Sequence, residues 1–581
     1  MKILGISAFF HDAAAAIVVD GVIVAAAQEE RFSRIKQDAS LPVQAVRYCL
    51  DEAELSMAEI DYVVFYEKPL RKFERILVSQ LRAFPRGLRQ FGRAMRTWLG
   101  SRLWLKSDIC KELGCSSQQL LFSEHHLSHA ASAYLCSPFQ DAAIVTIDGV
   151  GESATTSVFH GFAEEGCPKI DLKLELPYPH SIGLLYSSLT AYLGFRVNEG
   201  EYKVMGLSSY GQPKYLEEFA SLASVGDDGS LEINPRYFSY HYHATKSFTP
   251  ALEALLGPSR IPGSPLEYPS GDIDMQRYAD VAASLQTFTE EYLLVLMGEA
   301  KRQTQSNSLC LAGGVALNSV ANRRICEEGP FEHVFVQPAA GDAGGALGAA
   351  LYASCVLHND PRPRLSSVAL GQSFAPASIE KFLDDCGVKY TKYSDDEELA
   401  DEVAQRMSVG QVGGWFQGRF EWGPRALGNR SILADPRYAS TRDRVNRAIK
   451  FREKFRPFAP MVLSEDTHLW FDLGRNRDRL LAPFMCSVMP ATAAAKEKLS
   501  AVVHVDGTAR VQVVGRSSNP RTRRLLQAFK KKTGVGVLLN TSMNLKDEPI
   551  CASPAEAYGA FVRSDMDFLT LENCLIVKDQ I

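Results

Sequence analysis

This sequence of 581 residues lacks several features that would identify a class of protein directly. The 12 cysteines form no CxxC pair and no framework spacing, so a cysteine zinc site is unsupported. We expect reduced thiols, mostly in the core. No apolar run approaches the roughly 18 residues of a membrane span, and the first strand meets polar residues too early for a signal-peptide core. A cytoplasmic protein with no membrane span is therefore expected.

An excess of one charge is missing as well. Lys plus Arg number 63 and Asp plus Glu number 68, so the formal net charge is −5. That balance argues against a dedicated nucleic-acid coat, and no nucleic-acid partner is expected. Hydrophobic residues make up 46% of the chain, which is enough to build a sizeable core. The length allows about three to five domain-sized units.

A strand–turn–strand pattern occurs twice in the first part of the chain. The apolar run Ala14–Val19 ends in Asp20-Gly21, a strong hairpin signal, and lies between the strands Ile3–Ser7 and Val22–Ala27. The second unit comprises the strand Ala142–Ile147, the glycine-containing turn 148–152 and the strand Ala154–Phe159. The repeat favours a duplicated α/β domain over two unrelated hairpins in a large α/β protein.

Two glycine-rich turns follow a long helix that the spacing of apolar residues predicts between 281 and 296. The strand that begins at Ser308 ends in Gly313-Gly314, and a helix is expected from Asn318. A second loop, 338–348, enters a helix of small residues. Free backbone N–H groups at such helix starts bind phosphate. Either close packing or nucleotide binding explains these glycines, and the occurrence of two loops favours nucleotide binding.

His125 and His129 would lie one turn apart on one face of a helix, which is a platform for two metal ligands. Such a pair is more often structural than metal-binding. Asp148 ends a predicted strand and Asp342 lies in the second glycine-rich loop, and together the four make a mixed nitrogen and oxygen set. That set suits Fe²⁺, Mn²⁺ or Zn²⁺ with open positions. His11, after the first strand, is either a general base for an alcohol or a plain turn residue.

Residues 361–364 mark a linker, beyond which arginine and aromatic residues crowd the stretch 415–460. Arginine forks bind phosphate, carbamate or carboxylate oxygens in pairs, so these cations predict an anion pocket. They are Arg419, Arg425, Arg430, Lys450, Arg452, Lys454 and Arg456. A later strand carries Asn540 and Ser542 towards its carboxyl end, where α/β sheets bind ligands. Arg510 adds a further cation.

A basic segment, residues 68–106, contains 11 Lys or Arg and one acid, Glu74, with aromatic residues interleaved. One interpretation is an amphipathic helical insertion that meets a membrane face or an acidic partner. The other is a solvated helical face that packs on the body or on a second subunit. The second is favoured because charge runs usually lie at the surface, and a homodimer stays open.

Several motifs together resemble the bacterial O-carbamoyltransferases, the group that decorates nodulation factors, cephalosporins, aminoglycosides such as tobramycin, and ansamycins. They are Ile3–Ser7 with His11-Asp12, residues 28–34, His125–His129, residues 200–207 and residues 418–429. The resemblance runs nearly end to end. It is weakest in the basic segment and around 240–270.

The resemblance implies an α/β fold of two domains. Residues 1–355 would be a metal-dependent carbamoyl-transfer domain with the duplicated ribonuclease-H-like fold of sugar kinases, Hsp70 and actin, similar to the threonylcarbamoyl transferase of tRNA modification. Residues 356–370 would be a linker. Residues 371–581 would form carbamoyl-adenylate in a domain similar to threonylcarbamoyl-adenylate synthase.

The resemblance also assigns site residues. The metal ligands would be His125, His129, Asp148 and Asp342, with Fe²⁺ as the first expectation and Mn²⁺ or Zn²⁺ as alternatives. The nucleotide loop would be Gly313, Gly314 and Asn318, with Lys203 nearby. The carbamoyl-phosphate and ATP site would be Arg419, Arg430, Lys454, Arg510 and Ser542, with Asn540 beside it. His11, Arg510 and Ser542 would be catalytic.

By this resemblance, carbamoyl phosphate and ATP with Mg²⁺ give carbamoyl-adenylate, and the carbamoyl group passes to a hydroxyl of a small-molecule acceptor. Either His11 or the metal would activate that hydroxyl. The acceptor cannot be inferred from the sequence. Two alternatives stay open: a kinase or ATPase of the same duplicated fold, and a non-catalytic nucleotide sensor.

Overall fold

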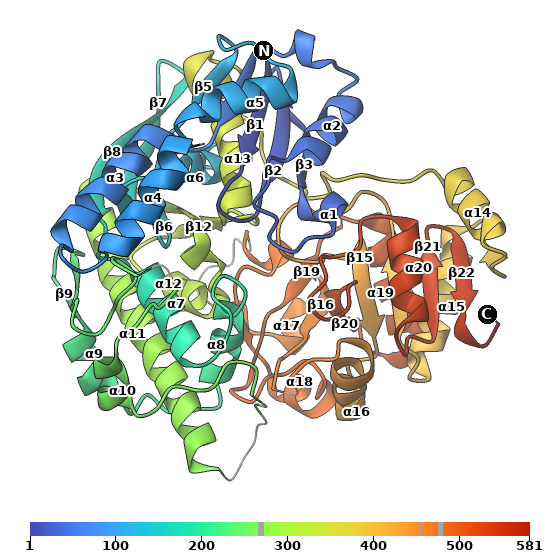
Figure 1. Ribbon diagram of the computed structural model, residues 1–581. Helices are drawn as coiled ribbons and strands as arrows, with labels where there is room; N and C mark the ends of the chain where they lie inside the picture. Colours follow the sequence, from blue (N-terminus) through green and yellow to red (C-terminus); the bar gives the residue numbers. More distant parts are fainter. Residues whose placement is uncertain are drawn as a thin grey trace. The chain divides into compact units, whose positions relative to one another are not determined.

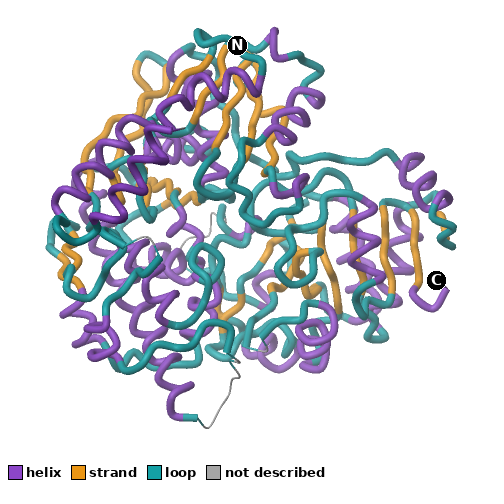
Figure 2. Tube along the Cα trace, viewed as in Figure 1, coloured by secondary structure: helices purple, strands orange, loops and turns teal. Residues whose placement is uncertain are grey.

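The computed structural model describes residues 1–100, 102–243, 245–264, 266, 272–453, 455–474, 480–516 and 518–580. The chain divides into two compact units. Unit 1 consists of Met1–Ala26 and Ala39–Arg364, and unit 2 consists of Ala27–Asp38 and Leu365–Ile581. Each unit combines β-sheets with helices, so the protein is a mixed α/β protein as expected (Figures 1 and 2).

The first sheet of unit 1 has the strand order β3-β2-β1-β4-β5. β1 pairs antiparallel with β2 and parallel with β4, which pairs parallel with β5. The predicted hairpin turn is confirmed, because Asp20 and Gly21 have φ values of 50° and 81°, as a two-residue hairpin turn requires. The strands are β1 (Lys2–Ser7), β2 (Ala14–Val19), β3 (Val22–Gln28), β4 (Tyr62–Phe65) and β5 (Leu120–Phe122).

The second sheet has the order β12-β11-β6-β7-β8. Its first strand, β6, again lies in the middle, antiparallel to the next strand β7 and parallel to β11, which pairs parallel with β12. Numbered within each half, both sheets therefore have the order 3-2-1-4-5, and the predicted duplication is confirmed. The strands are β6 (Ala142–Ile147), β7 (Ala154–Glu164), β8 (Cys167–Pro177), β11 (Ser308–Ala312) and β12 (His333–Val336).

Helices surround these sheets. The long predicted helix is α11 (Ile273–Thr304), which contacts α7, α8, α9 and α12. The other helices of unit 1 are α2 (Val43–Glu52), α3 (Pro69–Arg82), α4 (Leu88–Gly100), α5 (Leu105–Leu113), α6 (His125–Tyr134), α7 (Ile182–Tyr192), α8 (Glu201–Ser208), α9 (Leu216–Leu222), α10 (Pro250–Leu256), α12 (Ser319–Glu328) and α13 (Asp342–Leu351). A small sheet pairs β9 (Ala223–Val225) with β10 (Leu231–Ile233). Within the described residues, no helix has the length and apolar character that crossing a bilayer requires.

Unit 2 is built on an eight-stranded sheet of order β13-β22-β21-β14-β15-β20-β16-β19. Successive residues alternate between its two faces, so Phe416 packs in a core cluster with α14 and α20, and Trp415 packs in another with α15 and α19. The strands are β13 (Thr391–Lys392), β14 (Gly413–Phe416), β15 (Arg430–Ala434), β16 (Ala459–Leu463), β19 (Gln512–Val514), β20 (Val537–Ser542), β21 (Phe568–Leu571) and β22 (Cys574–Val577).

The helices of unit 2 are α1 (Glu30–Ser33), α14 (Pro376–Asp385), α15 (Asp396–Ser408), α16 (Ala439–Arg444), α17 (Thr467–Trp470), α18 (Ala493–Lys498), α19 (Pro520–Thr533) and α20 (Pro554–Val562). β17 (Met489–Pro490) and β18 (Thr508–Ala509) form a separate pair.

One segment of unit 2 lies near the start of the chain, far in sequence from the rest of the unit. Residues 27–38 group with it, whereas the sequence-based division placed them in the first domain. Hydrogen bonds between distant residues explain this grouping. Arg31 donates to the Gly423 carbonyl at 3.0 Å, and Arg34 donates to the carbonyls of Pro549 and Ile550, each at 2.8 Å. Hydrophobic patterning carries no signal for such long-range bonds to backbone carbonyls.

Glycine permits the helix packing that positions the site in unit 1. Every residue of α13 is buried, and the helix contacts both α6 and β1. A Cβ on Gly348 would lie 1.8 Å from the Ser128 carbonyl oxygen of α6. On the strand side, a Cβ on Gly5 would lie 1.9 Å from the Ala346 carbonyl oxygen of α13. A larger side chain at Gly348 would force α13 away from α6, and one at Gly5 would force it away from β1.

We expect Gly348→Ala to destabilise the protein by about 1–3 kcal/mol, because the added methyl overpacks the α6–α13 contact. Gly298, inside α11, is the matched control, since a Cβ there meets nothing within 4 Å. Gly298→Ala should stabilise by about 0.5–1 kcal/mol through helix propensity alone. Urea unfolding of both variants would measure these changes. Equal effects of the two substitutions would contradict the packing argument.

Candidate active site

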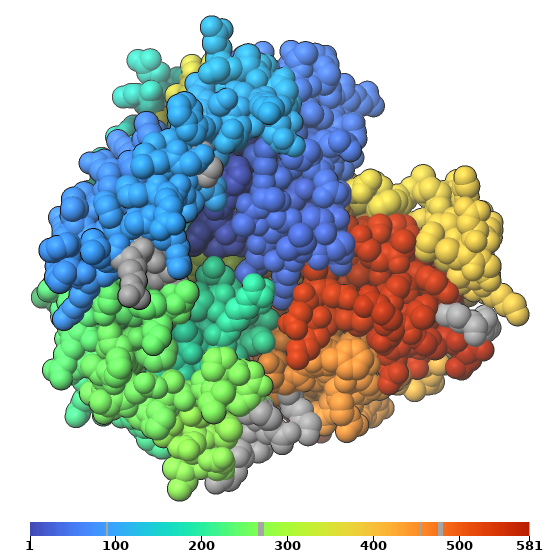
Figure 3. Space-filling model, in the orientation of Figure 1, coloured from blue at the N-terminus to red at the C-terminus, as the bar shows by residue number. Residues whose placement is uncertain are grey.

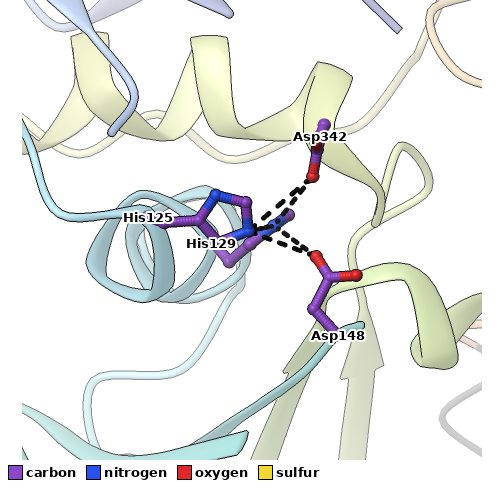
Figure 4. A group of neighbouring side chains, drawn as sticks. All are labelled: His125, His129, Asp148 and Asp342. Carbon is purple, nitrogen blue, oxygen red and sulfur yellow. Dashed lines mark hydrogen bonds and ion pairs between the residues drawn. The ribbon is translucent and has the colours of Figure 1, made fainter. Parts of the chain in front are cut away.

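Two histidines and two aspartates converge in unit 1 (Figure 4). His125 and His129 come from the first turn and a half of α6, Asp148 directly follows β6, and Asp342 is the first residue of α13. Three of the four are buried, and Asp148 is half-buried. The sequence placed these residues in one hypothetical site, and the fold brings their ligand atoms within 4.8 Å of one another.

The distances suit a single metal ion. The two imidazole Nε2 atoms lie 3.1 Å apart, and they lie 3.3 and 3.1 Å from Asp148 Oδ2. Asp342 Oδ1 lies 3.7 Å from His125 Nε2 and 3.6 Å from His129 Nε2. Ligand atoms that each lie about 2.1 Å from one ion stand about 3.0–3.4 Å apart at octahedral to tetrahedral angles. This donor set fits Fe²⁺, Mn²⁺ or Zn²⁺, but it does not choose among them.

The two carboxylates and the imidazoles shift one another's pKa values. Burial lowers the pKa of His129, but hydrogen bonds to Asp148 and Asp342 outweigh burial and raise it to about 9. Burial likewise raises the pKa of Asp148, but the hydrogen bonds from His125 and His129 bring it well below its usual range. Two carboxylates facing two imidazoles thus form a site in which positive charge is strongly favoured.

Two supporting residues were missed by the sequence analysis. The Glu152 carboxylate accepts the backbone N–H of His125, at 2.9 and 3.1 Å, and that of Lys68, at 2.7 Å. It therefore holds the N-terminus of α6, and with it the first histidine, in place. Tyr66, directly after β4, donates its hydroxyl to Asp342 Oδ2 at 3.3 Å. Both residues lie shortly after the end of a strand, where α/β sheets place functional side chains, and this position could have identified them in the sequence.

His126, between the two site histidines, has a different role. Its Nδ1 lies 2.7 Å from Thr146 Oγ1 and its Nε2 lies 3.1 Å from the Ala154 carbonyl oxygen. Burial, followed by its two histidine neighbours, lowers the pKa of His126 to about 3. It is a neutral core histidine with both ring nitrogens engaged.

His11 lies beside the cluster. Its Nε2 is 3.9 Å from Asp342 Oδ2, and its Nδ1 is 3.1 Å from Asp12 Oδ2. Burial lowers the pKa of His11, but the carboxylates of Asp342, Asp12 and Asp148 outweigh burial and raise it to about 10. The structure therefore places the sequence-predicted base next to the metal-ligand candidates.

The glycine turn also adjoins the cluster. Gly313 has φ 88°, and a Cβ on it would lie 2.2 Å from the Ile147 carbonyl oxygen, so this glycine is required by close packing. A Cβ on Gly314 would lie 3.1 Å from Asp148 Oδ1. Asn318 caps α12 by accepting the Ala321 N–H at 3.1 Å and donates to Gln286 at 3.0 Å. Close packing therefore accounts for Gly313, and nucleotide binding by this turn stays a prediction.

Lys203 lies on α8, which approaches the start of α12. Met205, two residues further along α8, accepts a long hydrogen bond of 3.9 Å to its Sδ from Ser319 Oγ. The Lys203 ammonium lies 5.8 Å from the centre of the Phe195 ring. Its predicted place near the nucleotide loop agrees with this arrangement, and nucleotide binding by it stays a prediction.

In unit 2, a group of cations surrounds Arg510. Burial and then the neighbouring Arg425 and Arg456 lower the pKa of Arg510 well below its usual range. Its Nε is buried, with no hydrogen-bond partner among the described residues. Like charges gathered in a partly buried place are stabilised by a bound anion, so Arg510 is well suited to a phosphate.

Ser542 ends β20 and is bonded to a buried lysine that the sequence analysis grouped with the cations but did not assign to the site. Lys450 Nζ donates to the Ser542 carbonyl at 2.9 Å, to Ser542 Oγ at 3.3 Å and to Asn544 Oδ1 at 2.6 Å. Burial, then Arg452 and Arg456, lower the pKa of Lys450 well below its usual range. Arg456 therefore acts electrostatically on both Lys450 and Arg510.

Asn540 lies within β20 rather than beyond its end. Its Nδ2 donates to the Ala426 carbonyl at 3.0 Å and to Gln512 Oε1 at 2.8 Å. Its Oδ1 is buried, with no partner among the described residues. Asn540 therefore supports the loop that carries Arg425, and direct ligand contact by it stays a prediction.

Two of the predicted arginines serve the fold. Arg430 is completely buried and donates to the carbonyls of Gln417, Asn429, Gln372 and Ala552 at 2.8–3.4 Å. Arg419 is half-buried and donates to the carbonyls of Gly371 and Leu370. These bonds give the buried Arg430 guanidinium a structural role, and phosphate binding by it stays a prediction. Lys454 lies outside the described residues.

Both halves of the chain match a known protein family. Residues 2–351 match the family described as carbamoyltransferase N-terminus, and residues 404–578 match carbamoyltransferase C-terminus. The chain belongs to the carbamoyltransferase family. The resemblance inferred from the sequence motifs is thereby confirmed. The family adds carbamoyl groups to hydroxyl groups, which makes this carbamoyltransferase an enzyme of the transferase class.

Several relatives extend over most of the chain. Nodulation protein NolNO of Sinorhizobium fredii is 38% identical over 98% of this chain and 79% of its own length. The uncharacterized protein sll1178 of Synechocystis sp. is 46% identical over 99% of this chain and 96% of its own. The 3'-hydroxymethylcephem-O-carbamoyltransferase of Amycolatopsis lactamdurans is 33% identical over 58% of this chain and 60% of its own.

We expect the full-length carbamoyltransferase to bind one divalent metal ion per chain, and His129→Ala or Asp342→Ala to lower its affinity by about 100-fold or more, because each removes a ligand. Glu152→Ala should lower the affinity by about tenfold, since it loosens the helix start that carries His125. Elemental analysis and calorimetric titration would measure both effects.

The control is His160→Ala, because His160 pairs with Asp141 at 2.8 Å, outside the cluster. Its metal content should equal that of the wild type. Metal bound equally by His129→Ala and the wild type would contradict the assignment of the four ligands.

Proposed function

We propose that this carbamoyltransferase uses ATP and carbamoyl phosphate, through carbamoyl-adenylate, to carbamoylate a hydroxyl group of a sugar or natural-product acceptor. The observation that carries the proposal is the pairing of two chemistries in one chain. A buried His₂Asp₂ cluster lies in the part that matches the family's N-terminal domain, and a phosphate-suited cation group lies in the part that matches its C-terminal domain.

The adenylating step is assigned to unit 2. Carbamoyl phosphate would first release phosphate by reaction with water, and the carbamate would attack the α-phosphorus of ATP, so that pyrophosphate leaves. ATP enters with Mg²⁺. Carbamate is a poor electrophile, and the adenylate supplies it with a good leaving group. Arg510 and Lys450 would stabilise the charge that moves onto the departing phosphates. The Ser542 hydroxyl, which donates to Asn544 Oδ1 at 2.6 Å, would rotate to donate a hydrogen bond to them.

The transfer step is assigned to unit 1. The acceptor hydroxyl would attack the carbamoyl carbon, lose its proton, and displace AMP. His11 is the candidate for the group that takes this proton, because it lies beside the cluster with Asp12 orienting its Nδ1. A cation held between Asp148 and Asp342 would offset the carboxylates that raise the pKa of His11, and would so favour its neutral form. A metal held by His125, His129, Asp148 and Asp342 would polarise a phosphate or carbonyl oxygen as a Lewis acid. The backbone N–H groups after Gly313 and the start of α12 would hold the AMP phosphate.

The finer fold relationships belong to the same proposal. Unit 1 is proposed to share the fold of the tRNA threonylcarbamoyl transferase, supported by its two sheets of identical strand order. Unit 2 is proposed to resemble threonylcarbamoyl-adenylate synthase. The division of labour between residues 1–355 and 371–581 rests on these relationships.

The released products separate this proposal from its alternatives. The full chain would be incubated with ATP, carbamoyl phosphate and a panel of hydroxyl acceptors. A carbamoyltransferase of the proposed kind releases pyrophosphate and AMP and adds CONH₂ to the acceptor, as mass spectrometry would show. A kinase or ATPase releases ADP, and a nucleotide sensor releases neither.

The two half-reactions should separate genetically. Arg510→Gln or Ser542→Ala should lower carbamoyl-phosphate-dependent pyrophosphate release by about 10²–10³, since the departing charge loses a donor. His129→Ala should leave pyrophosphate release largely intact and abolish the carbamoylated product. Coupled assays for pyrophosphate and AMP, with chromatography of the product, would measure each variant.

Arg524→Gln provides the matched control, because Arg524 pairs with Asp396 at 2.8 Å away from the cation group. It should retain both activities. If His129→Ala stopped pyrophosphate release as completely as Ser542→Ala, a single shared site would replace the two-site scheme.

A further inference from the structure

The basic segment, residues 68–106, exposes an unusual amount of apolar surface. Its helices α3 and α4 pack against each other, with the Phe73 and Trp98 ring centres 5.2 Å apart. The segment nevertheless holds seven of the 23 exposed large hydrophobic side chains among the described residues. Six of the seven are 60–70% exposed: Leu70, Leu81, Phe84, Leu88, Leu99 and Trp104. A solvated helical face does not account for this apolar surface.

The exposed apolar residues line up along the helices. Leu70 and Leu81 are 11 residues apart, about three turns of α3, and so lie on the same face, with Val78 close by. Leu88 and Leu99 have the same spacing on α4. Both helices thus present an outward apolar row, and the segment lies at the molecular surface among the blue atoms at the left of Figure 3.

The cations of the segment fall into an inner and an outer group. Towards the body, Lys68 and Arg71 pair with Glu124 at 3.0 and 2.8 Å, and Lys72 pairs with Glu67 at 2.9 Å. The outer group consists of Arg82, Arg86, Arg93 and Arg96. All four are exposed, and within the described residues no ion pair joins them to a carboxylate. The local charge is strongly positive on a chain whose formal net charge is −5.

We propose that the basic segment docks on an anionic lipid surface. Exposed leucines with Phe84 and Trp104 enter the headgroup boundary of a bilayer, and arginines beside them pair with lipid phosphates. An acidic protein surface would complement the arginines but would leave the apolar rows in water. Docking of this kind requires no helix that spans the membrane.

The segment is also connected to the loops of the candidate active site. Arg75 donates to the Gly151 carbonyl at 2.9 Å, in the loop after Asp148. The Lys72 ammonium lies 5.3 Å from the Phe10 ring centre, and the Arg102 guanidinium lies 4.8 Å from that of Phe9. Docking would therefore hold the loops that carry His11 and Asp148 near the lipid surface, while the docking itself does not depend on the proposed reaction.

Vesicle binding by the full-length protein tests the proposal without any activity assay. Vesicles of phosphatidylcholine with 30 mol% phosphatidylglycerol should bind the protein, and pure phosphatidylcholine vesicles should bind it at least tenfold less. Binding should weaken as salt rises. Arg82→Glu, Arg93→Glu and Arg96→Glu combined should lower the partition coefficient on the order of 100-fold or more, at roughly fivefold per arginine lost. Leu81→Ser, Phe84→Ser and Leu88→Ser combined should lower it by about tenfold or more.

The matched controls carry substitutions of the same kinds at exposed positions outside the basic segment. Lys381→Glu, Lys389→Glu and Lys498→Glu combined change the net charge equally, and Leu172→Ser, Ile261→Ser and Ile273→Ser combined remove equally exposed apolar groups. Both controls should bind vesicles like the wild type, and circular dichroism should show every variant folded.

Trp104 supplies an independent optical signal. It is 64% exposed, whereas Trp98, Trp415, Trp422 and Trp470, the other four of the five tryptophans, are buried. Brominated lipids should therefore quench Trp104 on docking, and Trp104→Phe should remove the quenching while vesicle sedimentation persists.

Three results would overturn the proposal. The first is no binding to vesicles that contain phosphatidylglycerol. The second is binding that both segment variants leave unchanged. The third is binding to polyglutamate, or self-association through the segment, in place of vesicle binding.

Discussion

The close approach of α13 to α6 is the contact on which the site of unit 1 depends. Gly348 lets the two helices meet at the Ser128 carbonyl, and this contact brings the first residue of α13 beside the histidines of α6. Asp148 completes the cluster from the end of a central strand. Four titratable side chains are thereby held together in a buried place, where their charges must be balanced by protons or by a metal. The geometry of the candidate site therefore depends directly on the packing of these helices.

Unit 2 shows how burial divides cations between two roles. Arg430 uses its guanidinium to satisfy backbone carbonyls in the core, where an unsatisfied carbonyl would be costly. Burial, followed by the charges of Arg425 and Arg456, lowers the pKa of the Arg510 guanidinium. The first arrangement is stable by itself, and the second gains stability from an anion. The phosphate chemistry proposed for the C-terminal half of this carbamoyltransferase depends on that distinction.

The basic segment has one face towards the protein and another towards the solvent. Its inner cations are used in ion pairs with the body, and its outer cations stand beside exposed apolar rows. Two such faces on one pair of helices satisfy two environments, the protein on one side and a lipid boundary on the other. The sequence showed the charge excess, whereas the exposure of the leucines became visible only in the folded chain.

The sequence by itself determined the duplicated strand pattern, the hairpin at Asp20-Gly21, the long helix and the four residues of the His₂Asp₂ cluster, because these depend on local periodicity, turn chemistry and residue type. The family motifs pointed to the same four residues. Tertiary structure alone decided that residues 27–38 join unit 2, that Glu152 and Tyr66 support the cluster, and that Arg430 is structural. Each of these depends on which distant backbone or side-chain group a residue meets, and spacing along the chain carries no such information.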